Sequence, residues 1–127
     1  MSGSALRSLT KAAIWLSTCA VLVAMIDYVA DARMRARMVP QCRWNDVRPT
    51  REAMPYLARW CIVERDVVIL RLYDEAGGTL LAERMFDYPD VPRIYWELDE
   101  LGYRTFTDWG AIGLPPSTLD RWRTRLP

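Results

Sequence analysis

The longest apolar stretch of the chain lies near its N-terminus. Residues 12–26 carry no charge, and a helix needs roughly 20 predominantly apolar residues to cross a bilayer core. Extension of the stretch to Ala30 provides this length and places Tyr28 at headgroup level, where aromatic rings are favoured. The pattern therefore predicts a single transmembrane and juxtamembrane helix over residues 12–38, after a short tail over residues 1–11.

Two other interpretations of this stretch remain open. Basic residues, an apolar stretch and a small-x-small triplet at Ala30, Asp31 and Ala32 also match the order of a cleaved signal peptide. A buried or interfacial helix of a soluble protein is the third interpretation. We favour an uncleaved anchor.

The orientation of the predicted span rests on conflicting signals. Arginines after the span outnumber the basic residues before it, and the positive-inside rule then places the C-terminal part in the cytoplasm. The signal-like order of residues 1–32 favours export instead. We expect a single-pass protein of the inner (plasma) membrane with an exported C-terminal domain, and the cytoplasmic orientation stays open.

After residue 56 the apolar and polar residues follow a pattern typical of strands instead of a long helix. Residues 39–56 hold several prolines and predict a linker, and residues 57–127 predict a small domain. Three apolar runs, at residues 57–64, 67–73 and 79–86, are separated by turn-forming residues and predict an antiparallel meander. The best-defined turn is the hairpin loop at residues 74–78, which ends in two glycines.

The remainder of the domain shows helical signals. Asp90 and Pro92 suit a helix start, Ile94, Leu98 and Leu101 recur at helical spacing, and Gly102 suits a C-cap. This pattern predicts a helix packed on the sheet. A short fourth strand at residues 103–106 is expected to follow.

A last helix should open at Ser117, a favourable N-cap residue. Its inner face is expected to carry Leu119, Trp122 and Leu126. The predicted fold class is thus α+β: one transmembrane helix, then a three- to four-stranded antiparallel meander, one packed helix and a C-terminal helix.

The composition of the chain excludes several kinds of catalytic and metal site. The chain has 17 Lys and Arg, 16 Asp and Glu, and no histidine, so catalytic triads and zinc sites that need histidine are excluded. The acids Glu97, Asp99 and Glu100 are interpreted as a solvated face, and Ser117 lacks an activating base. We predict no catalytic residues, no metal site, no cofactor and no enzymatic activity.

Two cysteines, Cys42 and Cys61, lie outside the predicted span. In an exported domain such a pair predicts a disulfide. In a cytoplasmic domain they would be two small buried side chains.

Arginine and tryptophan supply the candidate contact residues, because both are enriched at protein interfaces. We expect Trp109, in a loop, to be exposed as an anchor for a partner, with Trp44 as a weaker candidate. The arginines near the C-terminus are candidates for partner or phosphate contact, and those after the span for anionic lipid headgroups. The two sets are Arg121, Arg123 and Arg125, and Arg33, Arg35 and Arg37.

These features predict a membrane-anchored, non-enzymatic protein that binds another envelope protein as an assembly, inhibitory or immunity-like component. Arginine in place of lysine, together with many alanines, suggests a bacterial or phage origin. Membrane lipid is a second expected partner, nucleic acid is not expected, and the sequence is compatible with homo-oligomers. The alternative is a cytoplasmic-facing tethered domain that binds nucleic acid or anionic lipid through its arginines.

Overall fold

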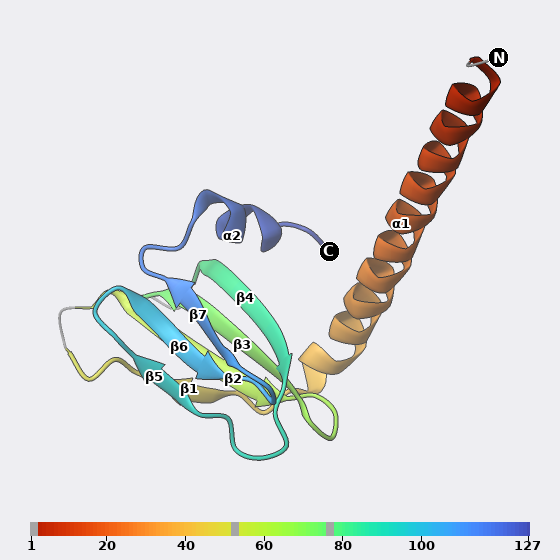
Figure 1. The fold of residues 1–127 in the computed structure, drawn as a ribbon. Coiled ribbons are helices and arrows are strands. Elements are labelled where there is room, and N and C mark those ends of the chain that lie inside the picture. The colour runs from red at the N-terminus through yellow and green to blue at the C-terminus, as the bar shows by residue number, and fades with distance from the viewer. Residues whose placement is uncertain (1–2, 52–53, 76–77) are drawn as a thin grey trace. The chain divides into compact units, whose positions relative to one another are not determined.

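The computed structural model describes residues 3–51, 54–75 and 78–127. The chain divides into two compact units, Met1–Pro40 and Gln41–Pro127. The first unit holds the long helix, and the second holds seven strands and a short helix in the described residues. Figure 1 shows these elements.

Helix α1 spans Gly3–Met38, and a single 3-10 turn, η1, follows at Val39–Gln41. The regular helix ends before Pro40, which cannot donate a backbone hydrogen bond. Its apolar side chains are exposed, including Leu16 and Val23. The predicted N-terminal helix is confirmed, and it is long and apolar enough to cross a membrane or to act as a signal sequence.

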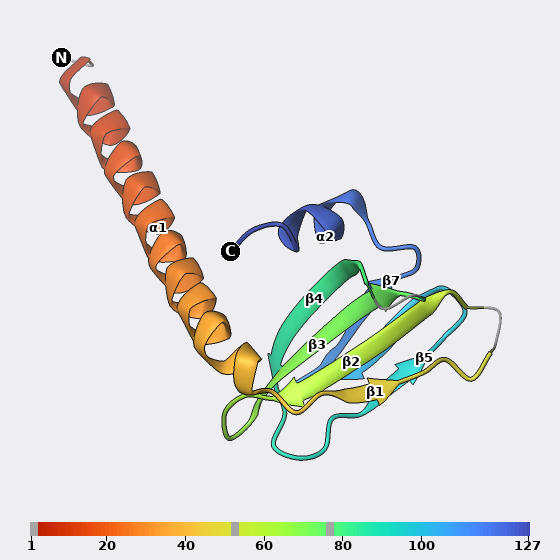
Figure 2. The same cartoon turned by 180° about the vertical axis from the view of Figure 1, so that it is seen from behind.

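The first sheet contains strands β1 (Asn45–Val47), β2 (Tyr56–Ile62), β3 (Val67–Asp74) and β4 (Leu80–Asp87). They are antiparallel and lie in the order β1-β2-β3-β4 (Figure 2). The predicted meander is confirmed, and the segment expected as a linker contributes β1.

The β3–β4 turn is held by an aspartate. The Asp74 carboxylate accepts hydrogen bonds from the backbone N–H groups of Gly78 and Thr79, at 3.1 and 3.2 Å. Gly77, also expected in this turn, lies outside the described residues.

The helix predicted from Asp90 to Gly102 is wrong. The same residues form β5 (Ile94–Trp96) and most of β6 (Glu100–Arg104), which join β7 (Trp109–Gly113) in a second antiparallel sheet of order β5-β6-β7. Ile, Tyr and Trp in succession favour a strand, and Leu98, expected on the helix's buried face, lies exposed in the β5–β6 turn.

Glycine has a different role in this sheet from the predicted helix cap. Gly102 lies opposite Tyr95, and Gly110 lies opposite Tyr103. A Cβ atom at either glycine would overlap the facing tyrosine ring. The absence of a side chain therefore lets each ring lie flat across the neighbouring strand, a known stabilising pair in sheets.

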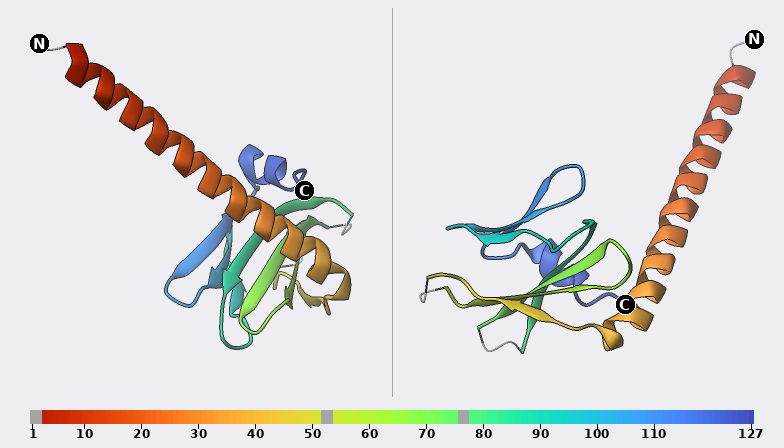
Figure 3. Two further views of the ribbon diagram at one scale, coloured as in Figure 1. Left: turned by 90° about the vertical axis from the view of Figure 1, so that its right-hand side faces the viewer. Right: turned by 90° about the horizontal axis from the view of Figure 1, so that it is seen from below.

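The two sheets lie as separate layers (Figure 3) and enclose the core between them. Phe86 of β4 stacks on Tyr103 of β6 with their ring centroids 4.6 Å apart. The remaining buried members of this core are Ala58, Val68, Leu70, Leu72, Ala82, Leu101 and Ile112.

Helix α2 spans Thr118–Arg123. The prediction that Ser117 caps it is confirmed, since Ser117 and Asp120 form a reciprocal capping box. The predicted inner face is wrong: Leu119, Trp122 and Leu126 are exposed, whereas Asp120 is buried. Polar contacts explain the orientation, because Asp120 binds Arg84 of β4 and the Thr124 hydroxyl donates to the Leu80 carbonyl.

Candidate functional site

The outer face of the β5-β6-β7 sheet carries the candidate site. Residues alternate between the two faces of a strand, so Ile94, Trp96, Leu101 and Ile112 point into the core, and their neighbours point to solvent. Two aromatic side chains, Tyr95 and Trp109, and one cation, Arg104, lie on the solvent face. We name these three residues the aromatic cluster.

The members of the aromatic cluster contact one another across three strands. Tyr95 and Trp109 meet edge to face, with their centroids 5.6 Å apart and their planes at 71°. The Arg104 guanidinium lies 5.3 Å from the centroid of the Trp109 ring. Gly102 of β6 lies between β5, which carries Tyr95, and β7, which carries Trp109. Because Gly102 has no side chain, nothing separates the two rings at this position. The cluster is therefore a preformed surface of two rings and one cation.

Trp109 is held at the end of a tight turn. The Thr105 amide donates to the Asp108 carbonyl at 2.8 Å, and the Asp108 amide donates to the Thr105 hydroxyl at 2.9 Å. The Trp109 amide donates to the Asp108 carboxylate at 2.8 Å. The side chain is nevertheless 54% exposed, as expected from its sequence position, although it begins a strand instead of lying in a loop. A large rigid ring is therefore presented to solvent on a fixed backbone.

Trp44 lies in a different environment. Its ring contacts the Arg71 guanidinium at 5.1 Å on the outer face of the first sheet, and it is half-buried. Arg71 also donates to Glu83 at 2.7 Å. Burial alone would lower the pKa of Arg71, but the hydrogen bond and charge of Glu83 outweigh it and raise that pKa. Trp44 is therefore part of an internal network.

Cys42 and Cys61 form a disulfide with their Cα atoms 5.8 Å apart. Cys61 is fully buried and lies opposite Ile69. The bond joins the segment after η1 to β2, as predicted. Disulfides are typical of domains outside the reducing cytoplasm.

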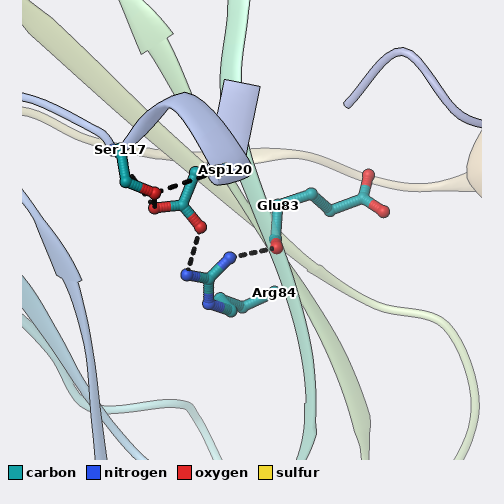
Figure 4. A network of polar contacts seen from close by, with 4 residues as sticks. All are labelled: Glu83, Arg84, Ser117 and Asp120. Carbon is teal, nitrogen blue, oxygen red and sulfur yellow. Dashed lines mark hydrogen bonds and ion pairs between the residues drawn. The ribbon is translucent and has the colours of Figure 1, made fainter. Parts of the chain in front are cut away.

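The C-terminal arginines Arg121, Arg123 and Arg125 are all exposed around α2. The helix itself is attached through Arg84, whose guanidinium lies 2.6 Å from the Asp120 carboxylate (Figure 4). Burial by itself would raise the pKa of Asp120, but hydrogen bonds from Arg84 and Ser117 hold that pKa below its ordinary value.

The other predicted residues lie apart from the aromatic cluster. Arg33, Arg35 and Arg37 belong to the last turns of α1, where cations suit the helix dipole. Glu97 and Asp99 lie in the β5–β6 turn, and Glu100 begins β6. They therefore do not share a helix face.

No group of three His, Cys, Asp or Glu side chains that could hold a metal ion occurs among the described residues. Two small hollows, about 180 and 250 Å³ in volume, lie near Arg51 and Met54. The first is lined by Trp96, whose indole nitrogen is buried and has no hydrogen-bond acceptor in the described part of the chain.

A comparison of the chain with protein-family models, curated proteins and solved structures finds no match.

Sequence reasoning missed Tyr95 and Arg104 as partners of Trp109. The available signal was the alternation of Ile94 and Trp96 with Tyr95, which is a strand pattern. Helical spacing in the same segment obscured it.

Proposed function

We propose that this protein is a membrane-anchored, non-enzymatic component of a bacterial or phage envelope system, and that its exported domain binds another protein. The observation that carries the proposal is the exposed aromatic cluster. Trp, Tyr and Arg are the residues that most often dominate the binding energy of protein interfaces. In this cluster they lie together on a sheet face that covers no core.

Rigidity supports the same conclusion. A side chain that is already ordered loses little conformational entropy when it binds. Tyr95 and Arg104 restrict the Trp109 ring, and Asp108 restricts its backbone. The half-exposed ring can therefore enter a partner's pocket at a low entropic cost.

The anchor and the disulfide support the location. Helix α1 is apolar enough to hold the chain in a membrane, and a disulfide suits an exported domain. Attachment to a membrane confines binding to partners in or near that membrane, which points to an envelope system.

The test is co-purification from gently solubilised membranes. Trp109→Ala should lose the stoichiometric partner that the wild-type protein retains. The matched control is Trp122→Ala, which removes another exposed Trp, 57% accessible compared with 54% for Trp109, from α2. Retention of the partner by Trp109→Ala, or recovery of no partner with the wild type, would contradict the proposal.

Topology has its own test in intact cells that carry Cys19→Ala, which removes the one free cysteine of the described chain. An impermeant thiol reagent should label Cys42, the partly exposed member of the pair, only after the intact cells are treated with an impermeant reductant. Labelling that requires lysis would place the domain in the cytoplasm.

A second candidate function is binding of anionic lipid or nucleic acid phosphates by a cytoplasmic-facing domain. It is favoured by the exposure of Arg121, Arg123 and Arg125 around α2. Counterion release would make such binding fall steeply with salt. Binding of the domain to anionic vesicles that is insensitive to salt would eliminate it.

A further inference from the structure

Strand β7 ends the second sheet, and its backbone hydrogen bonds show which residues face the free edge. On one side of β6, the Arg104 amide donates to the Arg93 carbonyl at 3.1 Å. On the other side, the Leu114 amide donates to the Asp99 carbonyl at 2.7 Å. Even-numbered β6 residues therefore bond to β5, and odd-numbered ones bond to β7.

The register of β6 and β7 shows which residues of the edge strand β7 direct their backbone hydrogen-bonding groups toward β6. Tyr103 pairs with Gly110 and Leu101 with Ile112, so these β7 residues direct their backbone groups inward. Trp109, Ala111 and Gly113 direct theirs away from the sheet. Ala111 and Gly113 are exposed, and no described backbone group outside the sheet bonds to them.

This edge lacks the usual protection against strand pairing. Natural edge strands are commonly shortened, bulged, or supplied with charges or proline. Strand β7 contains Trp109, Gly110, Ala111, Ile112 and Gly113, with no charge and no proline. By contrast, β1 and β5 are only three residues long, and the edge strand β4 is contacted by α2.

The free edge is sterically complementary to itself. If two copies of β7 pair antiparallel about Ala111, Trp109 of each copy faces Gly113 of the other. A Cβ atom at Gly113 would have no neighbour within 4 Å, so the space beside this glycine is open. Trp109 can therefore keep its contacts with Tyr95 and Arg104 while the strands approach. The pair repeats the aromatic-opposite-glycine arrangement already present twice in this sheet.

Charge within the edge strands does not oppose this arrangement. Strand β7 contains no charged residue from Trp109 to Gly113, so antiparallel pairing about Ala111 brings no like charges together between the two strands.

We infer that β7 is a homodimerisation edge, at which two copies of this chain join their three-stranded sheets into one continuous sheet about Ala111. Ala111 exchanges both backbone hydrogen bonds with its counterpart, and the Gly113 amide donates to the Trp109 carbonyl of the second copy. The Trp109 amide keeps its bond to Asp108. The dimer presents two aromatic clusters on one face, and it does not depend on the proposed binding of another protein.

The test is site-specific cross-linking of the full chain in native membranes. Paired residues at this type of position have Cα atoms about 5.5 Å apart, so Ala111→Cys, in a Cys19→Ala background, should be joined into a dimer by a short thiol cross-linker. The control is Leu98→Cys, which lies in an exposed turn of the same sheet. Equal cross-linking of both variants, no dimer with Ala111→Cys, or cross-linking of Ala111→Cys to a different protein would each overturn the inference.

A second pair of variants tests the edge without cysteine chemistry. Ala111→Lys places a charge at the dimer axis and should convert the detergent-solubilised dimer to monomer. Phe106→Lys adds the same charge in the neighbouring turn and should leave the dimer intact. Circular dichroism of both variants verifies folding, and a folded Ala111→Lys dimer would overturn the inference. Loss of the dimer with retention of an envelope partner would separate this result from the proposed function.

Discussion

The outer faces of the two sheets differ in how their large side chains are used. On the four-stranded sheet, Arg71 joins Trp44 to Glu83, and Arg59 binds Asp46 at 2.9 Å. The Cys42–Cys61 disulfide adds a covalent link. On the three-stranded sheet, Tyr95, Arg104 and Trp109 contact one another on the outer face and stay partly or fully accessible.

The comparison separates stability from recognition within one small domain. Contacts on the first sheet hold separate segments of the chain together, so their loss should lower the free energy of unfolding. Contacts in the aromatic cluster join side chains on the outer face of the three-stranded sheet, where Arg104 and Trp109 remain exposed. Their loss should be measured in binding, and variants of the two faces should separate these two properties.

Removal of the disulfide should have the largest effect. Cys42→Ala should lower the free energy of unfolding by about 3 kcal/mol, as expected for release of a loop of this size, where the cysteines are 19 residues apart. Urea unfolding in a Cys19→Ala background measures the change. Reductant should destabilise the parent but not Cys42→Ala, and equal stability of the two proteins without reductant would contradict the expectation.

The attachment of α2 to β4 should rank second. Asp120→Asn removes the charge that compensates Arg84, whose side chain is only 24% exposed, and should cost about 2 kcal/mol at neutral pH. Unfolding of the variant and the parent at pH 7 measures this cost. Asp99→Asn, an exposed acid in a turn, should change stability little.

The pH dependence follows from the lowered pKa of Asp120. Because the folded pKa lies below the unfolded one, the stabilisation is present above the ordinary aspartate pKa of about 3.9. It is lost as pH falls through the lowered folded pKa. The stability difference between the parent and Asp120→Asn should therefore shrink in acid. A difference that stays constant down to pH 2 would show that the charge of Asp120 is not responsible.

Two glycines allow a matched test of the inner and outer faces. Gly110→Ala forces its methyl group against Tyr103, which is buried and stacked on Phe86, so overpacking should cost about 2 kcal/mol. Gly102→Ala meets Tyr95, whose ring can swing toward solvent, and should cost less than about 1 kcal/mol. Thermal unfolding of both variants measures the difference. Equal costs would show that Tyr95 is as confined as Tyr103.

The smallest effect on stability is expected at the aromatic cluster. Trp109→Ala loses one ring contact and one exposed cation–π contact, and should cost less than about 1 kcal/mol. Trp44→Ala removes the half-buried counterpart on the first sheet and should cost more. Urea unfolding measures both variants. A larger loss of unfolding free energy from Trp109→Ala than from Trp44→Ala would show that the outer face of the second sheet contributes more to stability than that of the first.

Prediction from sequence succeeded where the signal was local. Residues 67–73 are mostly β-branched or apolar, and the following aspartate and glycines mark a turn, so the hairpin could be predicted from the sequence. Ser117 followed by Asp120 three residues later is a capping pattern. Two cysteines outside the apolar helix leave one pairing, and the structure forms it.

Prediction failed where two periodicities overlapped. Ile94, Leu98 and Leu101 fit a helix, whereas Ile94 and Trp96, then Leu101 and Tyr103, fit two strands. The second pattern prevails because Gly102 and Gly110 accept tyrosine rings from neighbouring strands. Those rings come from partners that only the assembled sheet brings together.

The sequence by itself determined the apolar helix, the β3–β4 hairpin and the cap of α2, since each depends on residues close together in the chain. Tertiary structure decided the second sheet, the exposure of Trp122 and the composition of the aromatic cluster. The physical reason is that these features depend on long-range pairs, such as Arg84 with Asp120 and Tyr95 with Trp109. The ion pair between Arg84 and Asp120 directs the Asp120 side of α2 toward β4, and the apolar residues of α2 therefore face solvent.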